Sequence, residues 1–130
     1  MTEIIGKGEV TLVQILLEMF PRDIIRKQVK LKELLKGDFK KTMSLREEKE
    51  TVDVVLYHGN KTYAIRVMGR DHLGTMKSEI DRIQKRILEM NKCIVIDIWY
   101  YEAKELFRDK NNANSREEVK WILKQHKIEV

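Results

Sequence analysis

The stretch from Thr51 to Met68 decides the fold, because its composition is that of two strands joined by a tight turn. Thr51-Val-Asp-Val-Val-Leu-Tyr-His58 and Lys61-Thr-Tyr-Ala-Ile-Arg-Val-Met68 are rich in β-branched and aromatic residues, and Gly59-Asn60 separates them. Glycine and asparagine tolerate the positive φ angles that a two-residue hairpin loop requires. The sequence therefore predicts an antiparallel hairpin, and its expected facing pairs are His58 with Lys61, Leu56 with Tyr63, and Asp53 with Arg66.

The residues before this hairpin predict a helix followed by a strand. Residues 10–20 place apolar side chains at helical spacing, and Pro21 ends the pattern. Residues 24–35 alternate apolar and charged positions, which suits a half-exposed strand, although Leu34 and Leu35 leave a helix open at the end. Residues 37–50 are polar and irregular, and we expect a loop there.

After the hairpin, a loop over 69–74 leads into a helix over 75–90, for which Thr75 or Asp71 is the expected N-cap. Its expected apolar stripe consists of Met76, Ile80, Ile83, Ile87 and Met90. Residues 93–99 are almost continuously apolar, which predicts a strand buried on both faces, central in the sheet and parallel to the strand before the helix. Ser115-x-x-Glu118 matches a capping box that would open a last helix.

These elements predict an α/β fold in which helices cover both faces of a mixed sheet of about four or five strands. With 130 residues, the chain is expected to form one domain over 1–130. One cysteine, Cys93, excludes a disulfide framework, and no apolar run is long enough for a membrane span. We therefore expect a soluble, cytoplasmic protein. High Lys and Glu usage is also found in thermophilic proteins.

The charge is uneven along the chain. There are 26 Lys+Arg and 21 Asp+Glu, for a net charge of +5. The segment from Arg22 to Lys41 contains eight bases and three acids. Such a segment could attract a phosphate backbone, or it could be an ordinary solvated basic face.

Several segments, taken in order, resemble the PD-(D/E)xK nuclease superfamily. The most similar branch contains the very-short-patch-repair mismatch endonucleases. In that branch an aspartate lies on the first hairpin strand, an acid-x-acid-Gly-x-x-His pattern ends the second, an Asp-x-x-Arg-like helix follows, and an apolar strand ends in an aromatic residue. The corresponding segments here are Val52-Asp53-Val54-Val55, Tyr63 to His72, Asp81-Arg82, and Leu88 to Trp99. The resemblance covers residues 9–99 and implies a restriction-endonuclease-like three-layer sandwich.

Matched residue by residue, the resemblance implies that Asp53 occupies the first metal-binding position. It also implies that His72 ends the second motif and that Glu9 is the glutamate of the first helix. Arg66 stands where a second acid is expected, and Met68 stands where an acid or a lysine is expected. A guanidinium has no lone pair for a cation, and a thioether is a poor magnesium ligand. The implied active site is degenerate, and Asp53 would bind Mg²⁺ or Mn²⁺ only if the protein is active.

Three interpretations of this site remain open at the level of sequence. In the first, Asp53 and Arg66 form a cross-strand ion pair on a former nuclease scaffold. In the second, phosphate is bound by Arg66, Arg70 and His72. In the third, the missing groups have moved to the helix after the hairpin, and Asp53 acts with Glu79, Asp81 or Lys77.

The first expectation for function is a nuclease-like protein that binds nucleic acid, DNA rather than RNA, without efficient catalysis and without a cofactor. Alternatives are a metal-dependent DNA endonuclease and a structural or regulatory interaction domain, and Trp121 could serve a homodimer interface. The candidate site residues are Asp53, Arg66, His72, Glu9 and Asp81. The candidate nucleic-acid-binding residues are Arg26, Lys27, Lys30, Lys32, Arg70 and Lys77.

Overall fold

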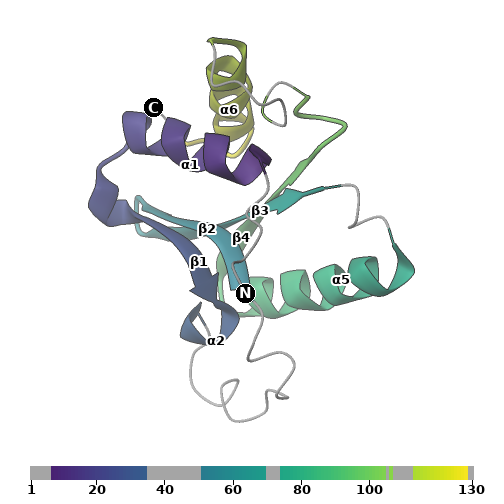
Figure 1. Cartoon of the computed structure of the whole chain (residues 1–130). Coiled ribbons are helices and arrows are strands. Elements are labelled where there is room, and N and C mark those ends of the chain that lie inside the picture. Colours follow the sequence, from purple (N-terminus) through teal and green to yellow (C-terminus); the bar gives the residue numbers. More distant parts are fainter. Residues whose placement is uncertain (1–6, 35–50, 70–73, 105, 107–112, 129–130) are drawn as a thin grey trace, which may run out of the picture.

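The chain folds into one mixed sheet with helices on both faces (Figure 1), which confirms the predicted α/β class. The computed structural model describes residues 7–34, 51–69, 74–104, 106 and 113–128. Within them the order is α1 (Lys7–Met19), η1 (Arg22–Ile24), β1 (Ile25–Lys30), α2 (Leu31–Leu34), β2 (Thr51–His58), β3 (Lys61–Met68), α5 (Thr75–Met90), β4 (Cys93–Trp99) and α6 (Ala113–Gln125). The predicted loop over 37–50 lies outside the described residues.

The predicted hairpin is confirmed in both register and turn. Strands β2 and β3 are antiparallel, with His58 opposite Lys61 and Leu56 opposite Tyr63. Gly59 and Asn60 have φ angles of 58° and 66°. Both angles are positive, as a type I′ turn requires, and its twist matches that of the two strands. The local turn chemistry is therefore sufficient to set the pairing of the sheet's middle strands.

Strand β4 is parallel to β3, as predicted, but it is not central. The strand order is β1-β2-β3-β4, so β4 lies at one edge of the sheet formed by the described strands. Its burial is also incomplete: Cys93, Ile96 and Ile98 are buried, whereas Val95, Asp97 and Trp99 are only partly buried. A helix crossing over from β3 can place the next strand on either side of the sheet, and here it adds β4 at the outside.

Two apolar cores lie on opposite faces of the sheet. The larger core joins α1 and α6 to one face, through residues such as Leu16, Ile65, Ile96 and Leu123. The smaller core lies on the face that α5 covers and contains Leu88 among others. Because side chains alternate along a strand, even-numbered residues of β4 enter the first core and odd-numbered residues face α5.

Helix α5 has the predicted bounds, and its buried face includes Ile87 of the predicted stripe but not Ile83 or Met90. Leu88, Gln84 and Asn91 are buried, while Ile83 and Met90 are 44% and 58% exposed. The predicted stripe contains apolar residues only, whereas the observed buried positions include the polar residues Gln84 and Asn91, which form hydrogen bonds. The N-cap is Gly74, so the expected Thr75 cap is wrong, and Asp71, the other expected cap, lies outside the described residues.

Helix α6 begins two residues before the position that the predicted capping box gives it. Helix α6 begins at Ala113, so Ser115 lies inside it. The Glu118 carboxylate accepts a hydrogen bond from the backbone N–H of Leu106, at 2.9 Å. The side chain therefore ties α6 to the segment after β4.

Helices α1 and α6 are joined by a surface ion pair. Arg116 Nε and Nη2 donate to the two carboxylate oxygens of Glu18, at 2.9 and 3.2 Å. The hydrogen bond from Arg116 holds the pKa of Glu18 below its ordinary value. The pair links two helices that are far apart in the sequence but lie side by side on one face of the sheet.

Candidate functional site

One end of the sheet brings together residues from all four strands. Strands β1, β3 and β4 run in one direction and β2 in the other, so Lys30, Met68 and Trp99 lie at the end where β2 begins. Four neighbouring strands span three gaps, or roughly 14 Å. Residues that are widely separated in the chain are thereby gathered along this sheet end, which we define by Lys30, Thr51, Met68 and Trp99.

Arg66 is the most buried charged group near this sheet end. It is 4% exposed, and its guanidinium donates hydrogen bonds to three residues. Its Nε and Nη2 donate to the two carboxylate oxygens of Asp97, at 2.7 and 2.8 Å. Its Nη1 donates to the backbone oxygen of Asp81 at 2.7 Å and to Gln84 Oε1 at 3.1 Å. The guanidinium thus joins β3, β4 and α5 through a bidentate ion pair and two further hydrogen bonds.

The predicted ion pair between Asp53 and Arg66 is wrong. Arg66 binds Asp97 on the neighbouring parallel strand, where it lies directly opposite in register. Asp53 Oδ2 instead accepts the backbone N–H of Val67, at 2.7 Å. A guanidinium and a carboxylate pair best when two parallel N–H bonds can form, and Asp97 offers that arrangement to Arg66.

Glu9, the candidate from the first helix, belongs to a second polar group. It is 7% exposed, and its Oε1 accepts a hydrogen bond from Gln28 Nε2. Gln28 Oε1 in turn accepts from Thr51 Oγ1 at 3.0 Å. This chain of contacts links α1, β1 and the start of β2, two residues before Asp53. Two of the predicted acids, Glu9 and Asp53, are therefore brought to neighbouring positions on the same sheet end.

The strands are locally interrupted where this group lies. Gln28 has a φ of 50°, and the paired residues Lys27–Val54 and Val29–Val52 flank the position of Gln28 and Asp53. Val54 belongs to the core beneath α1, whereas Val29 and Val52 belong to the core beneath α5. Residues two apart in a regular strand share a face, so both strands turn over at this point. Asp53 sits at that interruption.

The other predicted residues are distributed around this region. Arg26, Lys27, Lys30 and Lys32 are exposed on β1 and α2. Arg26 contacts Glu33 at 3.7 Å, while the three lysines form no ion pair within the described residues. Asp81 and Lys77 lie on α5, and Asp81 contributes its backbone oxygen to Arg66. Arg70 and His72 lie outside the described residues.

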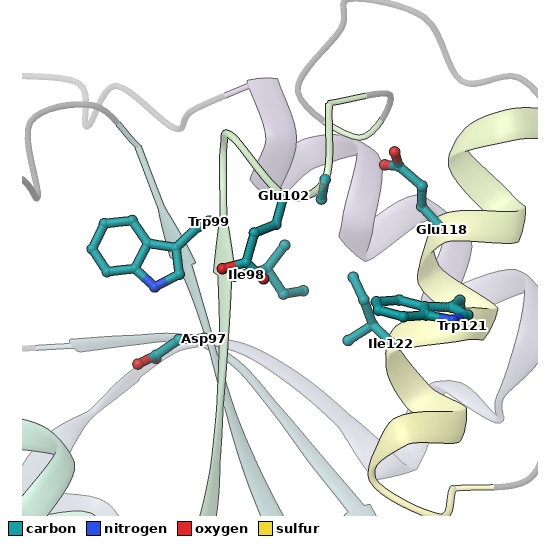
Figure 2. A pocket seen from close by; sticks show the side chains of 8 residues that line it. Asp97, Ile98, Trp99, Glu102, Glu118, Trp121 and Ile122 are labelled. Atoms are coloured by element: carbon teal, nitrogen blue, oxygen red, sulfur yellow. The ribbon is translucent and has the colours of Figure 1, made fainter.

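Sequence reasoning missed Asp97, Gln84 and Gln28. Asp97 carried a usable signal, because a lone acid inside an otherwise apolar strand needs a buried partner. Gln84 and Gln28 carried none, since glutamine is common on exposed helix and strand faces. Figure 2 shows that Asp97 and Trp99 project from the same side of β4, away from Ile98 and Trp121.

Comparisons with protein-family models, with curated proteins and with solved structures find no match to this chain. In the part of the chain that the structure describes, no three His, Cys, Asp or Glu side chains lie together as metal ligands would. Among the same residues, no helix is both long and apolar enough to cross a bilayer.

Proposed function

We propose that this protein binds nucleic acid across the sheet end, on a nuclease-like scaffold that does not hydrolyse it efficiently. The observation that carries the proposal is the buried Arg66–Asp97 pair. At the β3 position where the sequence resemblance expects a metal-binding acid, a guanidinium is fixed by four hydrogen bonds. A permanent positive charge that cannot ligate a cation works against a metal ion at this position.

The order of the elements also supports the proposal. A helix, three antiparallel strands, a helix and a parallel strand follow one another. The resemblance implies this sandwich of helices around a mixed sheet. Because one fold serves many activities, the order supports the scaffold, and the binding function must rest on the site.

The charge at one side of the sheet end supports binding to phosphate. Lys30 ends β1, Lys32 follows in α2, and both are exposed. Neither ammonium group is held by an acid among the described residues. Unpaired surface lysines bind phosphate as point charges and release counterions when they do so.

Salt dependence tests this proposal. We expect DNA affinity to fall with salt, and the Lys30→Gln/Lys32→Gln variant to reduce the slope of log K against log salt by about 2. Binding is measured by fluorescence anisotropy of a labelled duplex of mixed sequence. The matched control is Lys124→Gln, which removes an exposed lysine from α6 and should leave the slope unchanged. Affinity that does not respond to salt would contradict the proposal and favour an interaction domain.

A second candidate, a divalent-metal-dependent endonuclease, is favoured by the approach of Glu9 and Asp53 to the position of Gln28. The described residues do not provide a ligand set for a metal ion, and Asp53 already accepts a backbone N–H. We therefore expect no cleavage of supercoiled, mismatched or branched DNA by the purified protein with Mg²⁺ or Mn²⁺. Cleavage that is abolished by Asp53→Ala would establish the enzyme instead.

A further inference from the structure

A cavity of about 190 Å³ opens between α5 and the ends of β3 and β4. Its floor is formed by strand residues and its wall by α5, and the lining residues are Arg66, Met68, Ser78, Asp81, Arg82, Lys85, Asp97 and Trp99. It lies at the same sheet end as Lys30 but on the opposite edge. A strand of nucleic acid that follows the sheet end would therefore reach it.

Trp99 gives this cavity a flat aromatic wall. The ring is partly buried and stacks on Tyr101, with ring centroids 5.6 Å apart and an interplanar angle of 27°. Tyr101 makes an edge contact with Tyr100, at 5.4 Å. The indole is thus held in a defined orientation before any ligand arrives, which lowers the entropic cost of stacking a further ring on it.

Asp97 gives the cavity a fixed hydrogen-bond acceptor beside that wall. Its side chain is 18% exposed, whereas that of Arg66 is 5% exposed. Each carboxylate oxygen has two lone pairs, and Arg66 uses one on each oxygen. The two lone pairs that Arg66 does not use diverge from one another, so a single flat ligand could reach one of them. Figure 2 shows the carboxylate below the Trp99 ring on the same side of β4.

We propose that the cavity binds one unstacked nucleobase that carries an exocyclic amino group, adenine, cytosine or guanine, within a single-stranded nucleic acid. This inference rests on the proposed function. The base continues the stack on Trp99, and its amino group donates to Asp97. Adenine N6, cytosine N4 and guanine N2 are amino donors, whereas thymine has no amino group and presents the acceptor O4, which a carboxylate repels. Stacking and edge recognition together are how proteins read unpaired bases.

The size and charge of the cavity fit a base whose phosphates stay outside. A cavity of about 150 Å³ holds benzene, and drug-sized sites begin at about 300 Å³, so one base is the matching occupant. Arg82 and Lys85 lie exposed at the rim on α5. Arg82 forms an ion pair with Glu79, whereas Lys85 forms none among the described residues. Lys85 is therefore the rim cation best placed for a flanking phosphate.

Tryptophan fluorescence can test this inference, because the chain has two tryptophans and only Trp99 lines the cavity. In the Trp121→Phe variant, Trp99 is the single tryptophan, and its emission is excited at a wavelength that the four tyrosines do not absorb. The probes are oligothymidylates of seven nucleotides with adenine, cytosine, N6,N6-dimethyladenine or thymine at the centre. We expect saturable quenching by the adenine and cytosine probes, with about tenfold tighter binding than the all-thymine probe. The dimethylated probe keeps the ring but has no donor, and should lose the tenfold advantage.

Three variants and an independent readout complete the experiment. Trp99→Leu should lower the affinity for the adenine probe, measured by anisotropy, about tenfold. Its far-ultraviolet circular dichroism spectrum should be unchanged. Lys85→Gln should lower the affinity for all probes. Arg86 is exposed and lies outside the cavity, so Arg86→Gln should leave these affinities unchanged.

Several outcomes would overturn the inference. Equal affinity for the adenine and thymine probes would overturn the role of Asp97. Equal affinity for free deoxyadenosine monophosphate and the adenine probe would overturn recognition within a strand. Salt-dependent anisotropy without Trp99 quenching would overturn this inference and leave the proposed function standing. No anisotropy change with any DNA would overturn both.

Discussion

Replacement of Asp97 with alanine is expected to lower the free energy of unfolding by about 3 kcal/mol, the lower end of the range for breaking a buried pair. Arg66 stays charged at every relevant pH, and at 4% exposure it would keep its charge without a counterion. We expect the lower end of that range because the Asp97 side chain is 18% exposed, so water can enter the space that the carboxylate leaves and solvate Arg66 in part. Urea unfolding followed by circular dichroism measures the change.

Two comparison variants separate the buried charge from a simple loss of contacts. The double variant Arg66→Met/Asp97→Leu removes both charges, so no unpaired charge is left buried. Its free energy of unfolding should therefore be much closer to that of the parent than the value for Asp97→Ala. Glu79→Gln breaks the exposed pair with Arg82 and should cost less than about 1 kcal/mol. If Asp97→Ala costs no more than Glu79→Gln, Arg66 is not held as described.

Truncation of Ile96 to alanine is expected to cost about 2–5 kcal/mol, and its conservative change to valine about 0.5–1.5 kcal/mol. Ile96 is 1% exposed, lies opposite Ile65 on the parallel strand, and faces the core beneath α1 and α6. The cost combines the lost burial of three carbons with the cavity that remains. Chemical denaturation of the two variants against the parent gives the difference.

The matched control is Ile83→Ala on α5. Ile83 was expected in the apolar stripe of that helix, but it is 44% exposed. Its truncation removes less buried area than that of Ile96 and leaves no enclosed cavity, and alanine is the better helix former, so the free energy of unfolding should change by less than about 0.5 kcal/mol. An equal loss at Ile83 and Ile96 would mean that α5 packs through the stripe drawn from the sequence.

The candidate site shows where prediction from sequence succeeds and where it stops. Asp53 and Glu9 were proposed from the resemblance, and both lie beside Gln28, one by register and the other by hydrogen bond. Arg66 was placed on the correct strand but with the wrong partner. The facing residue in a hairpin follows from the turn, but a parallel neighbour is reached only after a helix and depends on where that helix returns the chain.

By itself the sequence determined the hairpin, the helix over 75–90 and the strand over 93–99, because turn chemistry and hydrophobic period act over a few neighbouring residues. Tertiary structure alone decided that β4 lies at the sheet edge and that Arg66 meets Asp97, 31 residues away. It also decided which face of α5 is buried. A buried charge turns toward whichever opposite charge the packed chain brings within reach, and that choice is not encoded in local spacing.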